Sequence, residues 1–315
     1  MNDPGEWSLC TAMHALAAGQ VSRRELVEAS LARIEHWQPR INAFVRLEAD
    51  AARAEAARRD RLPAPVPRPA LDGGLLAHKD MFERAGRVAT HGSRTSGATA
   101  SARTATLLGR LDAAAAIELG TLNMAEFALG PTGHNEAHGD CRNPWHPAHV
   151  AGGSSSGSGA AVAARLVHAA LGSDSGGSVR LPASANGVLG LKPTHGLLSR
   201  HGMMPLSPSI DVPGVFARHA RDLARVLDVL AGHDPADPRS SRRPVPDHEA
   251  ALAEPATVLR IGVPDAYFYE ELDADVEAAL DAARGELRRS GLGVAAVVTV
   301  ISTMLYGSAI EEGFL

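Results

Sequence analysis

Lysine is almost absent from this sequence, although cationic side chains are plentiful. Of the 31 lysine and arginine residues, only Lys79 and Lys192 are lysines. A genome biased towards GC-rich codons encodes arginine wherever any cation suffices, so a remaining lysine is a candidate for a role that arginine cannot fill. Arginine stays protonated at any practical pH, whereas a buried lysine can lose its proton and accept another. Lys79 follows an apolar run, which favours burial and a role as a base; an ordinary surface lysine is the alternative.

Cysteine, net positive charge and long apolar runs are also scarce. Cys10 and Cys141 form no CxxC pair, which excludes a disulfide framework and favours a reducing, cytoplasmic location. The net charge of -5 and the pI near 6.3 exclude a basic surface for nucleic acid. Residues 1–6 have no signal-peptide pattern, and the apolar stretch at 293–305 is too short to span a bilayer. We therefore expect a cytoplasmic protein that contacts neither nucleic acid nor membrane directly.

The 45% apolar content is ample for a large core. Short apolar runs alternate with amphipathic segments along most of the chain, a pattern that favours a mixed α/β sheet sandwiched between helices. The predicted strands are residues 75–77, 115–119, 169–171, 259–263 and 294–300. The predicted helices are residues 104–111, 159–166, 221–230 and 275–289.

A helical segment is expected to precede this core. Ser22 and Glu25 have the spacing of a capping box, and the helix that follows should end before Pro39. A second helix is expected at residues 51–61, and the proline-rich stretch 62–69 should connect it to the rest. We thus expect a helical entry segment at 1–70 that packs on an α/β core at 71–315, within a single domain.

Two segments rich in glycine and serine, residues 152–159 and 172–180, lie next to apolar elements. A phosphate-binding loop is one interpretation, but neither segment has the Gly-Lys-Ser/Thr ending of a P-loop. A nucleophile elbow is another, because residues 153–157 match G-x-S-x-G and would make Ser155 the nucleophile. An elbow needs a strand directly before it, whereas residues 143–147 contain two prolines.

The third interpretation joins both segments to the scarce lysine. Gly176 and Gly177 free the backbone to point N–H groups into one concavity, where an anion can bind. Ser178 follows directly, and acyl transfer requires a nucleophile beside such donors because its tetrahedral intermediate carries an oxyanion. A serine hydroxyl also needs a base, which Ser154 and Lys79 could supply as a relay.

A loop rich in histidine could instead suggest a metal site. His134, His138, His146 and His149 lie close together in the sequence, with Glu136 and Cys141 as further potential ligands. Their spacing fits no standard zinc pattern. We therefore expect no metal and no cofactor.

With Lys79 and these two segments, the sequence resembles the amidase signature family of Ser-cisSer-Lys hydrolases. The strongest matches are AHKD at 77–80, GGSS at 152–155 and GSDSGGSVR at 172–180. Further matches, all in register, are residues 120–127, 142–145, 190–194 and 230–234. The resemblance extends from about residue 8 to residue 300 and implies an enzyme that hydrolyses a small-molecule amide to a carboxylate and ammonia or an amine.

The resemblance also implies the roles of individual residues. Ser178 would be the nucleophile that forms the acyl-enzyme, Ser154 the bridging serine after a cis peptide bond, and Lys79 the base. The implied oxyanion donors are the backbone N–H groups of Ser175, Gly176, Gly177 and Ser178. Leu129 and Gly130 would contact substrate, Asp174 and Arg180 would brace the loop, and Lys192 would hold a neighbouring loop. A homodimer is the candidate assembly.

Two departures from the family pattern leave alternatives open. Ser156 stands where glycine is common, and it could alter the geometry of the relay. The chain also ends early relative to the family, so the fold is expected to be short at its C-terminus. The alternatives to a simple amidase are therefore a glutamine-hydrolysing chain, like the A subunit of an aminoacyl-tRNA amidotransferase, and a truncated remnant without activity.

Overall fold

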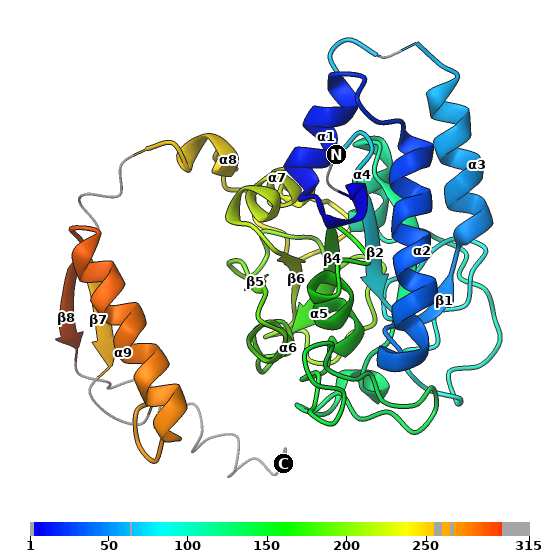
Figure 1. Cartoon of the computed structure of the whole chain (residues 1–315). Coiled ribbons are helices and arrows are strands. Elements are labelled where there is room, and N and C mark those ends of the chain that lie inside the picture. The colour runs from blue at the N-terminus through cyan, green and yellow to red at the C-terminus, as the bar shows by residue number, and fades with distance from the viewer. Residues whose placement is uncertain (1–2, 64, 255–259, 265–267, 298–315) are drawn as a thin grey trace. The chain divides into compact units, whose positions relative to one another are not determined.

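The computed structural model describes residues 3–63, 65–254, 260–264 and 268–297 (Figure 1). The chain divides into two compact units, Met1–Ala251 and Leu252–Leu315. The first unit contains a six-stranded mixed sheet with helices packed on it, which confirms the predicted fold class. The expected boundary near residue 70 stays a prediction.

The first unit contains most of the described elements. It begins with η1 (Pro4–Glu6), α1 (Leu9–Ala17), α2 (Arg23–Ile41), β1 (Phe44–Leu47) and α3 (Ala49–Asp60). It continues with β2 (Leu75–Lys79), α4 (Thr106–Ala113), β3 (Ile117–Leu122), η2 (Glu126–Ala128), α5 (Ser156–Ala163) and β4 (Ala169–Asp174). It ends with α6 (Arg180–Asn186), β5 (Leu189–Leu191), β6 (Val212–Ala217), α7 (Ala220–Leu230) and α8 (His248–Ala251).

The second unit has a simpler described part. It consists of β7 (Arg260–Pro264), α9 (Ala274–Arg289) and β8 (Gly293–Val297). The two strands pair in parallel, so the helix forms the crossover between them.

The order of strands in the large sheet is β1-β3-β2-β4-β6-β5. Strand β2 lies in the middle and runs parallel to both β3 and β4, whereas β6 runs antiparallel to β4. Leu76 is opposite Ala169, and His78 is opposite Leu171. Because β2 and β4 are parallel neighbours, their carboxyl ends meet at the same edge of the sheet, where loops can bring reactive groups together.

The two faces of the sheet pack into separate cores, because successive side chains of a strand point to opposite faces. Leu75 and Ala77 of β2 belong to the core that includes buried residues of α2, α3 and α5. Leu76, between them, belongs to the core that includes buried residues of α4 and α7. The sheet is therefore the middle layer of a three-layer unit, as Figure 1 also shows.

The capping box at the start of α2 is confirmed. The backbone N–H of Glu25 donates to Ser22 Oγ over 3.1 Å, and that of Ser22 donates to the Glu25 carboxylate over 2.7 Å. The prediction that this helix ends before Pro39 was wrong. Proline lacks only one backbone donor, and the N–H of Asn42 still bonds to Gln38 over 2.9 Å, so the last turn closes around Pro39.

The other predicted elements correspond to observed ones with ends shifted by a few residues. The predicted strands near 75, 115, 169, 259 and 294 are β2, β3, β4, β7 and β8; residues 259 and 298–300 lie outside the described residues. The predicted helices after residue 50 are α3, α4, α5, α7 and α9. Strands β1, β5 and β6 have no predicted counterpart; β6 contains Pro213 and Gly214, which weaken a strand signal. Within the described ranges, no helix is both long and apolar enough to cross a membrane.

Candidate active site

Lys79 is the last residue of β2, and its side chain is fully buried. Its Nζ donates to Ser154 Oγ over 2.7 Å and to Ser173 Oγ over 3.0 Å. Burial lowers the pKa of Lys79 to about 7, against the opposing charges of Asp174 and Asp211. A substantial fraction of this amine is therefore neutral near pH 7, and a neutral amine has the lone pair that a base requires.

Ser154 lies in a tight turn before α5, and its side chain is fully buried. The Gly153–Ser154 peptide bond is cis, as the resemblance implies. The N–H of Gly153 donates to Pro131 O over 2.6 Å, and the N–H of Ala125 donates to Ser154 O over 3.0 Å. A Cβ at Gly153 would lie 2.4 Å from Gly130 O, so only glycine fits there. The turn is thus fixed against the loop that follows β3.

The substrate-contact residues suggested by the resemblance lie in that same loop. The side chain of Leu129 is 65% exposed, which is high for a large apolar group. Gly130 follows with φ +125, a backbone conformation that suits glycine. The structure thus places both residues beside the Ser154 turn, and their contact with substrate stays a prediction.

The loop between β4 and α6 is wound around the carboxylate of Asp174. Its oxygens accept the N–H of Gly177 over 2.8 Å, the N–H of Val179 over 3.1 Å and the Arg180 guanidinium over 2.8 Å. Burial alone would raise the pKa of Asp174, but the hydrogen bonds from Arg180, Val179 and Gly177 outweigh it and lower the pKa. Asp174 and Arg180 therefore brace the loop, as predicted.

The same loop carries Ser178 and three unused backbone donors. In the part of the chain that the structure describes, no backbone group accepts the N–H of Ser175, Gly176 or Ser178. The N–H of Gly177, also predicted as an oxyanion donor, is instead bonded to Asp174. Ser178 is half-buried, and its carbonyl accepts the N–H of Ser155 over 3.3 Å. The nucleophile candidate therefore lies against the Ser154 turn, although no hydrogen bond joins these two described hydroxyls.

The neighbouring serines of the first Gly/Ser segment have other partners. Ser155 Oγ donates to Ser173 O over 3.2 Å and accepts the N–H of Ser173 over 3.3 Å, in a fully buried position. This geometry disfavours the elbow interpretation, because the Ser155 hydroxyl is held within the protein. Ser156 is also buried, and its Oγ donates to Asn123 O over 3.5 Å rather than to Lys79.

The histidine-rich loop contains local polar contacts. His138 Nε2 lies 3.0 Å from Thr90 Oγ1, and His134 pairs with Asp140 over 2.8 Å. Among the residues that the structure describes, no group of three or more histidine, cysteine, aspartate or glutamate side chains could hold a metal ion. The second lysine, Lys192, donates to Pro193 O over 3.1 Å, as expected for a residue that holds a loop.

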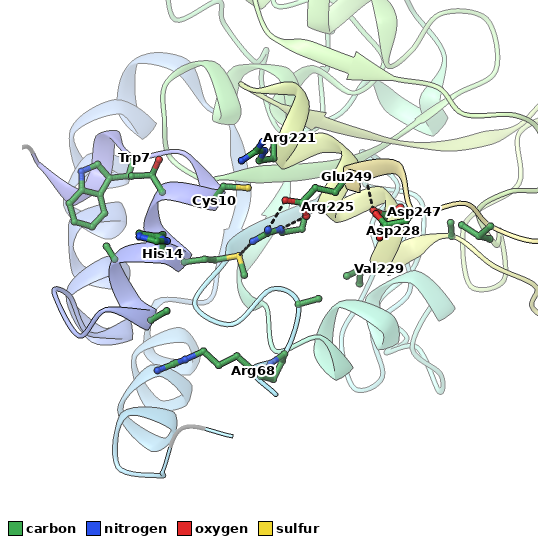
Figure 2. A pocket seen from close by; sticks show the side chains of 18 of the residues that line it. Trp7, Cys10, His14, Arg68, Arg221, Arg225, Asp228, Val229, Asp247 and Glu249 are labelled. Atoms are coloured by element: carbon green, nitrogen blue, oxygen red, sulfur yellow. Dashed lines mark hydrogen bonds and ion pairs between the residues drawn. The ribbon is translucent and has the colours of Figure 1, made fainter. Parts of the chain in front are cut away.

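A broad pocket elsewhere in the first unit is lined by parts of α1, α7 and α8 (Figure 2). None of the predicted catalytic residues lines it. Two of the charges that line it are paired with each other, because Arg225 contacts Glu249 over 2.6 Å. Burial raises the pKa of Cys10, which also lines the pocket, to about 12, so this thiol stays protonated and is a poor nucleophile. The pocket is therefore not the candidate active site.

Two residues of the site were given no role from the sequence. Ser173, the second partner of Lys79, lies in the Gly/Ser segment at 172–180. Nothing in the sequence distinguishes it from the other serines of that segment. Asp211 is buried and accepts a hydrogen bond from Ser175 over 2.5 Å, across 36 residues of sequence. No local pattern marks such a contact, because it depends on which strands pair.

These features define a site suited to acyl transfer, in which a partly neutral buried lysine contacts a serine beside a second, reachable serine and free backbone donors. Comparison with known proteins points to the same class of chemistry. Residues 25–307 match the family described as Amidase, and the chain belongs to that family.

One curated relative and two solved structures illustrate the similarity. The A subunit of the glutamyl-tRNA(Gln) amidotransferase of Anaeromyxobacter sp. (strain K) is 47% identical over 277 residues, which are 88% of this chain and 56% of that relative. Native peptide amidase from Stenotrophomonas maltophilia has a TM-score of 0.84 at 36% identity, covering 93% of this chain and 62% of that one. An inhibitor-bound vestigial complex, described as revealing the origins of an s-triazine catabolic enzyme, gives 0.89 at 37% identity, covering 96% and 66%. The chain thus spans little more than half the length of the curated relative.

Proposed function

We propose that this chain hydrolyses a carboxylic amide through an acyl-enzyme on Ser178. The observation that carries the proposal is the fully buried Lys79 amine, 2.7 Å from the hydroxyl of Ser154. Neutral Lys79 would accept the proton of Ser154 while Ser154 accepts that of Ser178. The second contact of the amine, to Ser173, would orient its lone pair towards Ser154.

The free backbone donors support the chemical step that follows. Ser178 Oγ attacks the amide carbonyl carbon and forms a tetrahedral intermediate whose oxygen carries the negative charge. The unbonded N–H groups of Ser175, Gly176 and Ser178 can stabilise that charge. Gly177 would first have to leave Asp174, so we assign the oxyanion hole to the other three residues. Ser154 then returns the proton to the leaving nitrogen, and water releases the carboxylate and free Ser178.

A fluorophosphonate probe tests the nucleophile, because a reactive serine displaces its fluoride and forms an oxygen–phosphorus bond. We expect the wild-type chain to be labelled, Ser178→Ala to lose labelling and Ser155→Ala to retain it. Mass spectrometry of the labelled peptide identifies the site. Labelling that is lost only in Ser155→Ala would favour the elbow interpretation. A well-folded wild-type chain without label would favour the inactive remnant.

The pH dependence of this labelling should report the ionisation of Lys79. Below its pKa the amine is protonated and cannot accept a proton, so labelling should slow as pH falls. The pKa of about 7 places the midpoint of this acid limb near neutrality. Pseudo-first-order labelling rates between about pH 5 and pH 9 measure the midpoint, and each unit below it should slow labelling by about tenfold. A rate that is flat across this range would contradict the assignment of Lys79.

A glutamine-hydrolysing chain within a larger amidotransferase is the second candidate, favoured by the name of the relative that is 47% identical. In that case the chain would act together with partner subunits. Ammonia release from glutamine and from a panel of simple amides separates the two candidates. Turnover of simple amides by the chain alone favours the amidase, whereas turnover of glutamine alone favours the amidotransferase component.

A further inference from the structure

A buried carboxylate that the proposed mechanism does not use lies beside the oxyanion loop. Asp211 is only 2% exposed and directly precedes β6. Its Oδ2 accepts the N–H groups of Leu206 over 2.9 Å and Ser207 over 2.8 Å. Its Oδ1 accepts the hydroxyl of Ser175 over 2.5 Å. Both oxygens are therefore occupied, and one of them reaches across to the loop that carries Ser178.

The position of this contact follows from the register of the sheet. In the antiparallel pair of β4 and β6, Asp174 is opposite Val212. The next pair in that register is Ser175 and Asp211, which lie just after the last residue of β4 and just before the first residue of β6. A side-chain hydrogen bond thus replaces the backbone ladder at this pair. As a result Ser175 is fixed in place while its own N–H stays free of the ladder, as an oxyanion donor requires.

We infer that Asp211 is a positioning residue for amide hydrolysis, which holds Ser175 so that its backbone N–H can serve the oxyanion hole. This inference rests on the proposed function. Asp211 also differs from Asp174 in its charge environment. Asp174 is paired with Arg180, whereas no lysine, arginine or histidine among the described residues forms an ion pair with Asp211.

The same carboxylate acts on the base through its charge. The groups that face Lys79 from neighbouring elements are Ser154, Ser173 and Asp174, and Asp211 adds its charge from the end of β6. Burial lowers the pKa of Lys79, and the negative charges of Asp174 and Asp211 oppose that effect. Removing the charge of Asp211 should therefore lower the pKa of Lys79 further and move the acid limb of labelling to lower pH.

Two variants separate positioning from charge. Ser175→Ala removes the hydrogen bond and keeps the charge of Asp211, so we expect labelling by the fluorophosphonate probe to slow about tenfold or more with an unchanged midpoint. Asp211→Asn weakens the bond and removes the charge, so we expect slower labelling with a midpoint shifted by about one pH unit towards acid. The full-length chain serves for both, with thermal melting as a check of folding.

A second buried pair provides a matched control. Asp234 is 6% exposed and accepts the hydroxyl of Ser199 over 2.5 Å and the N–H of Ala236 over 2.9 Å, at a place with no predicted site residue. Asp234→Asn and Ser199→Ala should lose stability without a change in labelling rate or midpoint at a temperature where they are folded.

The outcomes distinguish this inference from the proposed function. If the wild-type chain is not labelled at Ser178, the proposed function fails and the inference fails with it. If wild type is labelled but Asp211→Asn and Ser175→Ala react at its rate, only the inference is overturned. Equal losses in the control variants would also overturn it, since the effect would then be general destabilisation. If Asp211→Asn does not fold, the rate of Ser175→Ala decides.

Discussion

Replacing Lys79 with arginine should slow the reaction of Ser178 with the fluorophosphonate probe by about 10³-fold or more. Arginine stays protonated at any practical pH, so it cannot accept the proton of Ser154. The fully buried position also leaves no route for the longer guanidinium to reach solvent. Labelling rates of the purified full-length variants, from about pH 5 to pH 9, measure the loss. A Lys79→Arg variant that reacts at the wild-type rate would exclude Lys79 as the base.

The chain offers a matched control for this substitution in its second lysine. Lys192 is half-buried and donates to a backbone carbonyl, a contact that arginine can also make. Lys192→Arg should therefore retain labelling. Lys79→Met removes the amine without adding a buried charge, so it should fold and remain unreactive. Together these variants separate the loss of a base from the cost of burying a guanidinium.

Replacing Gly157 with alanine should destabilise the first unit by about 3 kcal/mol, at the upper end of typical overpacking costs. Gly157 lies in the first turn of α5, where a Cβ would be 2.4 Å from Ala43 O and 2.5 Å from Asn123 N. Both obstacles are backbone atoms, which cannot rotate away as a flexible side chain can. Because the turn with Ser154 directly precedes this helix, labelling should also slow.

A second helical glycine gives the opposite expectation. At Gly109 in α4, no described atom beyond the adjacent residues and the backbone of the helix itself lies within 4 Å of the added Cβ. Gly109→Ala should therefore stabilise the unit by up to about 1 kcal/mol through helix propensity. Urea unfolding followed by tryptophan fluorescence measures both effects, since all three tryptophans lie in the first unit. A Gly157→Ala variant as stable as wild type would contradict the close packing of α5.

The parts of this structure that the sequence predicts well are those with local causes. The capping box at Ser22 depends on residues three positions apart, and helices α3, α4, α5, α7 and α9 follow from local sequence patterns. Lys79 is noticeable because lysine is rare, and its contact with Ser154 agrees with the implied relay. Pro39 shows the limit of a local rule, since a proline in the last turn removes one donor and does not end the helix.

Two contacts near the candidate site are not predicted by the sequence, and the first of them depends on pairing between distant strands. Ser175 and Asp211 meet only because β4 and β6 are antiparallel neighbours in one particular register. The N–H of Gly177 is taken by Asp174, because the loop turns back on that carboxylate. Both facts change which donors can stabilise an oxyanion, and neither leaves a signal in the order of residue types.

Because Lys79 is buried, its reactivity with amine reagents also measures how often the surrounding structure opens. Amine-reactive reagents reach a lysine only where solvent does, and of the two lysines only Lys192 is partly accessible while the site is closed. Lys79 becomes reactive when β2 separates from the Ser154 turn, whether by local fluctuation or by global unfolding. With so few lysines, acetylation of that one side chain can be followed without interference from many others, and its rate reports how often the candidate active site opens.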